Sequence, residues 1–162
     1  MSTKIRVAVV GAAGAFGMKH LDGLQNIEDA EVTVVSATSQ EKADAVAAQY
    51  GVPHAVVGLE AVLERDDVDA VILATPTGMH AAQTRAVLAA GKHVQVEIPL
   101  ADSLADAQET LAAAEASDRV SMVGHTRRFN PSHQLVHDRI TAGEFNVQQM
   151  DVQTYFFRRT NT

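Results

Sequence analysis

Three glycines near the amino end of the chain have the spacing of a phosphate-binding turn. Gly11, Gly14 and Gly17 form the pattern G-x-x-G-x-x-G, directly after an apolar run and before residues with helical spacing. Glycines let backbone amides approach a pyrophosphate closely, and a helix N-terminus adds a positive dipole. The pattern predicts a dinucleotide site formed by Gly11, Ala13, Gly14, Ala15, Phe16 and Gly17. The alternative is a tight turn with a purely structural role. Because no Lys-Ser or Lys-Thr pair follows, a nucleotide triphosphatase loop is disfavoured.

Hydroxyl side chains after the second apolar run indicate which dinucleotide would bind. NAD sites usually place an aspartate or glutamate there to hold the ribose diol. This chain has Ser36, Thr38 and Ser39 instead, with Lys42 nearby. Hydroxyls can donate to a 2′-phosphate without repelling it, so we expect NADP in preference to NAD. The alternative role for these hydroxyls is that of ordinary residues at a strand end.

Basic residues near position 127 could meet an anionic substrate. His125, Arg127 and Arg128 follow an expected strand over 120–124. Ligands of α/β proteins bind at the carboxyl ends of parallel strands, and arginines recognise carboxylates there. We therefore expect these three residues to bind a small anionic substrate. A solvent-facing basic cluster is the alternative.

The elements that must position these residues alternate between strand-like and helix-like segments, which is typical of a parallel sheet covered by helices. We predict an α/β fold over 1–126, namely a Rossmann domain with a doubly wound parallel sheet. The expected strands cover 5–10, 32–37, 52–57, 69–75, 93–97 and 120–124. Ser103 and Asp106 resemble a capping box. The helix that they open is expected to bury a face made of Leu104, Ala107, Leu111 and Ala114.

The pattern changes over 127–162. Asn130 and Pro131 are typical of a helix start, and Gly143 of its end. Residues 147–159 form a long alternating run, which indicates a half-exposed antiparallel strand. We therefore expect a domain boundary near Arg127.

Composition and charge exclude several functional classes. The chain has 162 residues, a formal net charge of −7 and no cysteine. The acidic balance argues against a nucleic-acid partner. The lack of cysteine excludes disulfide scaffolds, thiol nucleophiles and cysteine-bound zinc. His133 and His137 lie four residues apart on an expected helix, but we expect no metal site because zinc sites need three or four ligands.

No stretch of the sequence resembles a membrane span, which needs roughly 20 consecutive apolar residues. We therefore expect no membrane partner and a cytoplasmic location. The alternative is a secretory signal, because Lys4 and Arg6 precede an apolar run over 7–18. Removing that run would delete the first strand of the predicted sheet.

Three further motifs occur in order, ATPTGMH at 74–80, AGKHV at 90–94 and EIP at 97–99. With these motifs the chain resembles the Gfo/Idh/MocA oxidoreductase family over essentially its whole length. The resemblance implies an NAD(P)-binding Rossmann domain over 1–126, hydride transfer at a carbinol carbon and usually a homo-oligomer such as a dimer. It also implies that 127–162 begin a second α/β domain with an open antiparallel sheet, of which the rest is missing.

The resemblance also implies roles for single residues near the nicotinamide. Glu97 would lie beside the cofactor. The nicotinamide ribose would be lined by Ala74, Thr75, Pro76, Thr77 and His80. Without the resemblance, the Thr-Pro-Thr segment is also a sound helix start, and His80 could be a satisfied helix residue.

Ile98 departs from the family pattern, which has lysine between the glutamate and the proline. Isoleucine carries no proton, so the catalytic residue is unknown, with Glu97 and His125 as candidates. A cyclic hemiacetal hydroxyl is more acidic than an ordinary alcohol and needs a weaker base. Together with these motifs, the resemblance implies an NADP-preferring dehydrogenase that oxidises a hemiacetal dicarboxylate to a lactone. The alternatives are a sugar or inositol dehydrogenase of the same family and a non-catalytic NADP(H)-binding module.

Overall fold

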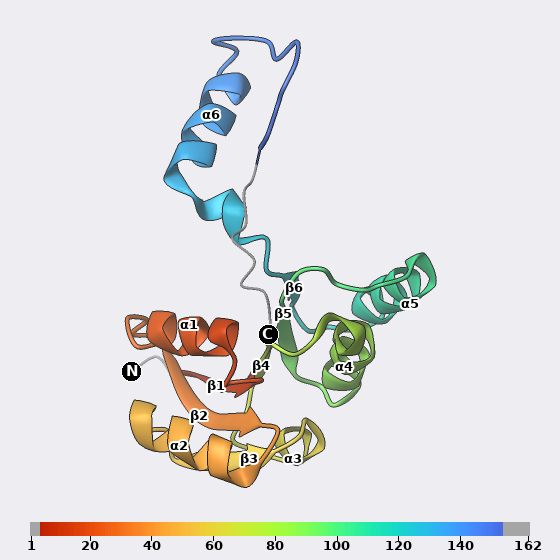
Figure 1. Ribbon diagram of the computed structural model, residues 1–162. Helices are drawn as coiled ribbons and strands as arrows, with labels where there is room; N and C mark the ends of the chain where they lie inside the picture. Colours follow the sequence, from red (N-terminus) through yellow and green to blue (C-terminus); the bar gives the residue numbers. More distant parts are fainter. Residues whose placement is uncertain (1–3, 154–162) are drawn as a thin grey trace, which may run out of the picture. The chain divides into compact units, whose positions relative to one another are not determined.

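A six-stranded sheet forms the frame of the protein (Figure 1). The structure, a computed structural model, describes residues 4–153. All five neighbouring strand pairs are parallel, in the order β3-β2-β1-β4-β5-β6. The strands are β1 (Ile5–Val10), β2 (Ala30–Ala37), β3 (His54–Val57), β4 (Ala70–Leu73), β5 (His93–Val96) and β6 (Ser121–Val123). The predicted α/β Rossmann fold is confirmed. The order reverses between β1 and β4, where doubly wound sheets bind their ligands.

Helices cover both faces of this sheet. They are α1 (Ala15–Leu24), α2 (Gln40–Tyr50), α3 (Glu60–Leu63), α4 (Thr77–Ala89) and α5 (Leu104–Glu115). Leu21 of α1 and Val46 of α2 pack on one face, against Val9 and Val35. A second hydrophobic core lies on the opposite face of the sheet, where α3 and α4 pack against the strands. The helices and the sheet therefore form three layers, α/β/α.

Local signals in the sequence explain several element ends. Ser39 and Ser103 cap α2 and α5 by accepting hydrogen bonds from backbone N–H groups three residues on. Gly51 ends α2 with φ +69°, a conformation that side chains disfavour. The expected third strand begins later than predicted, at His54, because Pro53 has no N–H to donate to a ladder.

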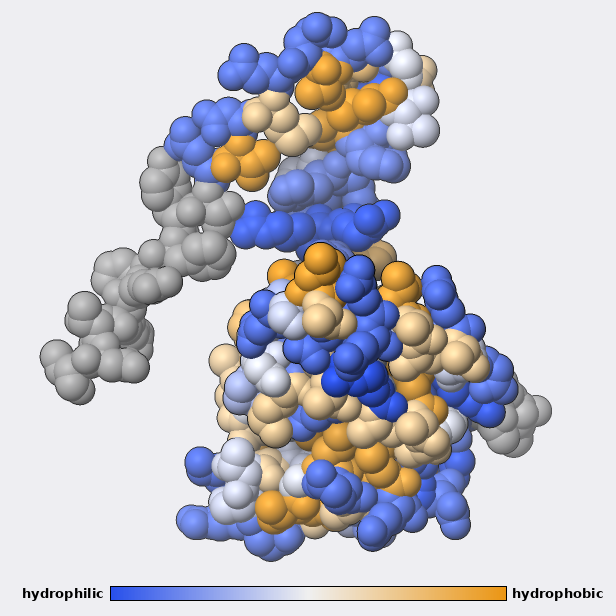
Figure 2. Space-filling model, turned by 90° about the vertical axis from the view of Figure 1, so that its right-hand side faces the viewer, coloured by the Kyte–Doolittle hydropathy of each residue, from blue (hydrophilic) through white to orange (hydrophobic). Residues whose placement is uncertain are grey.

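The predicted buried face of α5 is correct only in part, because Ala107 and Ala114 are half-buried and Ala114 packs against the core. Leu104 and Leu111 are 74% and 57% exposed, while Thr110 is buried and accepts a hydrogen bond from Arg85 of α4. Contact with α4, seen beside α5 in Figure 1, selects the helix face that carries small and polar residues. Hydrophobic residues consequently remain among hydrophilic ones on the surface of this unit, as Figure 2 shows.

The chain divides into two compact units, Met1–His125 and Thr126–Thr162. The second contains a 3-10 turn, η1 (Thr126–Phe129), and helix α6 (Pro131–Thr141). The side chain of Asn130 caps α6, as the sequence predicts. The strand predicted over 147–159 does not form in residues 147–153, and the rest of that segment lies outside the described residues. A strand needs a neighbour for its backbone groups, and the described part of this unit supplies none.

None of the helices that the structure describes is long and apolar enough to cross a membrane.

Candidate dinucleotide site

The glycine turn lies between the ends of β1 and β4, where the strand order reverses. Gly11 has φ +81°, and its N–H and that of Ala12 both donate to the carbonyl oxygen of Ser36, each over 3.0 Å. A Cβ on Gly11 would collide with the carbonyl of Ala74, at the end of β4. The turn is thus held against β2 and β4, and glycine is required at its first position.

Unpaired backbone donors surround this turn. Among the described residues, none accepts a hydrogen bond from the N–H groups of Ala13, Ala15, Phe16 and Gly17. Three of these belong to the first turn of α1, which carries no acidic side chain. Such donors at a helix N-terminus are suited to phosphate oxygens. The residues present therefore fit the pyrophosphate of a dinucleotide, and these four belong to the six for which the sequence predicts that role.

A cavity of about 720 Å³ adjoins the turn. It extends along the carboxyl ends of β1, β2 and β3 and reaches the segment that starts α4. Its lining includes eight predicted cofactor residues: Gly11, Ala13, Gly14, Ser36, Thr38, Ala74, Thr75 and Pro76. Lys42, Glu60, Met79 and Gln83 also line it. The cavity is large enough for a nucleotide-sized ligand.

The hydroxyls predicted to meet a 2′-phosphate are not equivalent. Ser36 is 1% exposed, and its hydroxyl donates to the carbonyl oxygen of Gly58 over 2.8 Å. Ser39 caps α2 by accepting from the N–H of Lys42. Thr38 is exposed in the cavity lining together with the Lys42 side chain. Thr38 and Lys42 are therefore the side chains best placed for an anion, and Ser36 shapes the wall behind them.

The Ala74–Thr77 segment forms the side of the cavity next to β4. The Ala74 N–H donates to Val10, and the Thr75 hydroxyl donates to Gln83 over 2.6 Å. Pro76 takes the N-cap position, and Thr77 is the first residue of α4. This arrangement fixes a turn whose backbone faces the glycine turn across the strand-order reversal.

His80 lies behind this turn rather than in the cavity lining. It is 2% exposed, and its Nε2 and Nδ1 lie 2.7 Å from the carbonyl oxygens of Thr75 and Pro99. The imidazole thus joins the end of β4 to the segment after β5. This geometry matches the structural alternative for His80, a helix histidine whose ring nitrogens are hydrogen-bonded within the protein.

Glu97 follows β5 and contacts a residue that sequence reasoning did not single out. Its Oε1 lies 2.7 Å from Nε2 of His20 on α1, and the two side chains are 11% and 22% exposed. Ile98, the next residue, is 47% exposed at this edge. The available signal was the position of His20, three residues after Gly17, which points back toward the turn through helical spacing.

The predicted substrate residues fall in both units. His125 ends the first unit, and Arg127 and Arg128 lie in η1 of the second. All three are exposed. His133 and His137 are exposed on α6, and within residues 4–153 no three His, Cys, Asp or Glu side chains are grouped to hold a metal ion.

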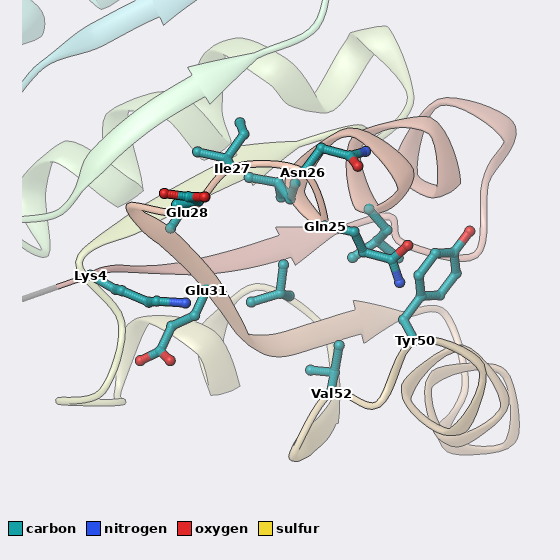
Figure 3. Close-up of a pocket in the computed structure, with 12 residues that line it drawn as sticks. Lys4, Gln25, Asn26, Ile27, Glu28, Glu31, Tyr50 and Val52 are labelled. Carbon is teal, nitrogen blue, oxygen red and sulfur yellow. The ribbon is translucent and has the colours of Figure 1, made fainter.

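A second cavity, of about 440 Å³, opens at the opposite edge of the sheet (Figure 3). Gln25 and Asn26 follow the end of α1, and Tyr50 ends α2. The Tyr50 hydroxyl donates to Asp22, which raises the pKa of Tyr50. Helix C-termini present carbonyl groups and the negative end of the helix dipole, so this cavity does not suit a phosphate. The glycine-turn cavity is the dinucleotide candidate.

Comparison with known proteins agrees with this geometry. Residues 5–125 match the model of the GFO_IDH_MocA oxidoreductase family with an NAD-binding Rossmann fold, and residues 131–162 match a C-terminal domain of bacterial oxidoreductases. A 4-carboxy-2-hydroxymuconate-6-semialdehyde dehydrogenase from Sphingobium sp. (strain NBRC 103272 / SYK-6) is 59% identical over 97% of this chain and 50% of its own length. An inositol 2-dehydrogenase from Rhodococcus erythropolis is 37% identical over 86% of this chain and 41% of its own.

Solved structures share the fold. A 3-ketoreductase from Actinomadura kijaniata, in complex with TDP-benzene and NADP, superposes with a TM-score of 0.79 at 32% identity, over 87% of this chain and 44% of its own. The chain spans half or less of the length of these relatives. The family match covers both the sheet and the glycine turn. The chain therefore belongs to the Gfo/Idh/MocA family of oxidoreductases, whose NAD-binding Rossmann domain it contains.

Proposed function

We propose that the full-length protein is an NADP-dependent dehydrogenase that oxidises the cyclic hemiacetal of 4-carboxy-2-hydroxymuconate-6-semialdehyde to 2-pyrone-4,6-dicarboxylate. The observation that carries this proposal is the 59% identity, over 97% of the chain, to a dehydrogenase named for that substrate. The reaction would belong to the degradation of protocatechuate by 4,5-cleavage. When bound, the oxidised nicotinamide supplies the hydride acceptor.

The residues of the site support the cofactor part of the proposal. The N–H groups of the glycine turn would hold the pyrophosphate, and Thr38 and Lys42 would face the 2′-phosphate. No carboxylate occupies 36–40, although Glu60 also lines the cavity. The relative solved with NADP at 32% identity supports the same choice. NAD is the competing cofactor.

The charges of basic side chains support the proposed substrate. The substrate carries two carboxylates, and His125, Arg127 and Arg128 supply exposed imidazole and guanidinium groups. Guanidinium groups bind carboxylates with two parallel hydrogen bonds. We assign these residues to substrate binding.

The proposal also includes a cytoplasmic homodimer. Light scattering of the purified protein would test the dimer, and cell fractionation would test the location.

The direct test is turnover by the full-length protein. The purified enzyme is mixed with the hemiacetal and either NADP or NAD, and reduced cofactor is followed by absorbance. We expect turnover with NADP and formation of the pyrone. Turnover of inositol or a sugar but not of the hemiacetal would identify a polyol dehydrogenase instead, a reading that the inositol 2-dehydrogenase relative motivates. Cofactor binding without turnover of any of these substrates would identify a non-catalytic NADP(H)-binding module.

A further inference from the structure

His20 and Glu97 form a polar pair that the cofactor site described above does not use. The residues are 77 positions apart in the chain and come from α1 and from the end of β5. A carboxylate oxygen only accepts hydrogen bonds, so Nε2 of His20 donates the proton of the 2.7 Å contact. In a neutral imidazole the other nitrogen, Nδ1, then carries a lone pair.

That lone pair is available. Among residues 4–153, nothing hydrogen-bonds to His20 Nδ1, and the one buried side-chain polar atom without a partner there is Thr84 Oγ1. Nδ1 therefore reaches solvent. The carboxylate of Glu97 contacts His20. Asp22, also on α1, instead accepts a hydrogen bond from the Tyr50 hydroxyl of α2.

The pair lies beyond the glycine-turn cavity, at the carboxyl end of β5. That cavity extends from the ends of β1, β2 and β3 across the strand-order reversal to Ala74–Pro76 after β4, and neither His20 nor Glu97 lines it. A dinucleotide spans the reversal point, so its nicotinamide half extends toward β4 and β5. The Glu97 N–H donates to Leu73, which places Glu97 at the shared carboxyl edge of these two strands. Ile98 beside it offers no ionisable group.

Resting on the proposed function, we infer that His20 is the proton acceptor of the dehydrogenase reaction and that Glu97 orients and charges its imidazole. The substrate O–H bond breaks and its proton passes to His20 Nδ1. The C–H bond on the same carbon breaks with its electron pair leaving as hydride to the oxidised nicotinamide, and a C=O bond forms. His20 then returns the proton to solvent, and Glu97 stabilises the imidazolium in between. A carboxylate behind an imidazole plays this part in other proton-transfer sites.

Two substitutions of His20 separate proton transfer from a structural role. In His20→Gln the side-chain amide can still donate to Glu97, but it cannot accept a proton near neutral pH. His20→Ala removes both. We expect both variants of the full-length enzyme to lose about 10²- to 10⁴-fold in kcat, with little change in NADP affinity. The acid limb of the wild-type kcat profile against pH should also vanish in His20→Gln. Wild-type kcat and an unchanged pH profile in His20→Gln would overturn the inference.

A second measurement does not depend on turnover. Diethylpyrocarbonate modifies accessible, unprotonated imidazoles, and peptide mass spectrometry locates the adduct. We expect His20 to react in the free enzyme and to be protected by NADP together with the pyrone product. Exposed His133 should react with or without these ligands, and buried His80, with both ring nitrogens engaged, should not react. A His20 that resists modification in the free enzyme would contradict an available Nδ1.

The failure of this inference is distinguishable from failure of the proposed function. If the wild-type enzyme does not oxidise the hemiacetal, the proposed function fails, and the rates of the variants are not needed. If the wild-type enzyme is active and His20→Gln retains its rate, the function stands and the assignment of His20 is wrong.

Discussion

The hydroxyl of Ser36 donates a 2.8 Å hydrogen bond to the carbonyl oxygen of Gly58. The bond joins the end of β2 to the loop after β3, and the carbonyl of Ser36 accepts from the glycine turn on the other side. Both the hydroxyl and the carbonyl of Ser36 are therefore hydrogen-bonded within the protein. Under the proposed function, the discrimination between NADP and NAD would fall to Thr38 and Lys42, which line the same cavity.

Thr38→Asp should reverse the cofactor preference. A carboxylate at this position would repel a 2′-phosphate and could accept from the ribose diol of NAD. Since a like charge at a partly exposed site costs about 1–3 kcal/mol, we expect NADP affinity to fall by roughly 10- to 100-fold. NAD affinity should hold or rise. Both affinities can be measured by titration calorimetry on the full-length protein.

Ser36→Ala is the matched control for Thr38→Asp. It removes the bond to Gly58 and should lower the free energy of unfolding by about 1 kcal/mol. The ratio of NADP to NAD affinity should stay as in the wild type. A changed ratio of NADP to NAD affinity in Ser36→Ala would show that the Ser36 hydroxyl does contact the 2′-phosphate.

Gly14→Val should abolish dinucleotide binding while the fold survives. Gly14 has φ −79°, which any residue adopts, and an added Cβ would lie 3.2 Å from the Gly11 carbonyl oxygen. The bulk would instead stand among the free N–H donors of the turn. Circular dichroism would report the fold, and calorimetry the affinity. Unchanged affinity for NADP would show that the pyrophosphate lies elsewhere.

Gly11→Ala provides the contrast to that variant. Its Cβ would meet the backbone of Ala74, and φ +81° is strained for alanine. We expect a loss of about 1–3 kcal/mol in stability or failure to fold. The two variants thus divide the glycine motif into a position needed for the ligand and a position needed for the turn.

The sequence predicted those parts of the molecule that depend on local pattern. Apolar runs identified all six strands, and cap residues such as Ser103 and Asn130 identified helix starts. The glycine spacing predicted where backbone N–H donors without acceptors would lie, because such donors at a strand-to-helix turn follow from local geometry. Tertiary contacts decided the rest. Leu104 and Leu111 belonged to the predicted apolar stripe, yet contact with α4 buries Thr110 and leaves both leucines exposed.

Polar partners distant in sequence were also beyond pattern reasoning. Whether the Ser36 hydroxyl faces a ligand or Gly58 depends on a loop 22 residues away. The His20–Glu97 pair depends on how α1 lies across the end of β5. Residue type and spacing restrict what a side chain can do, but the partner that it meets is set by packing of the whole sheet.

Lys92, part of the AGKHV motif, should prove structural. Its ammonium group is buried and donates to the carbonyl oxygens of Arg65 and Val68 over 2.7 and 3.0 Å. Lys92→Met would leave both carbonyls without this donor, so we expect the free energy of unfolding to fall by about 2 kcal/mol. Urea denaturation would measure it. Lys4→Met, at an exposed position, is the control and should change little. A loss of NADP affinity in well-folded Lys92→Met would instead point to a role in the site.

Asp69→Asn should destabilise the protein in a way that depends on pH. Arg6 holds Asp69 with two side-chain hydrogen bonds of 2.6 and 2.9 Å and a backbone N–H bond of 2.9 Å. These bonds lower the pKa of Asp69 from 3.8 to about 2. A carboxyl group with a lower pKa in the folded state adds stability above its unfolded pKa and loses it as pH falls through the folded value. The contribution should therefore be complete above about pH 5 and disappear between pH 4 and pH 2.

The expected size of this effect is set by the exposure of the pair. Because the side chains of Arg6 and Asp69 are both 37% exposed, solvent screening reduces the contribution to about 1 kcal/mol. Urea denaturation of wild type and Asp69→Asn from pH 7 to pH 2 would measure it. Asp118→Asn, at a side chain 82% exposed, is the control and should not change stability at any of these pH values. If the loss in Asp69→Asn were the same at pH 7 and at pH 2, packing rather than the charge of Asp69 would be responsible, since only an ionised carboxylate gives a contribution that acid removes.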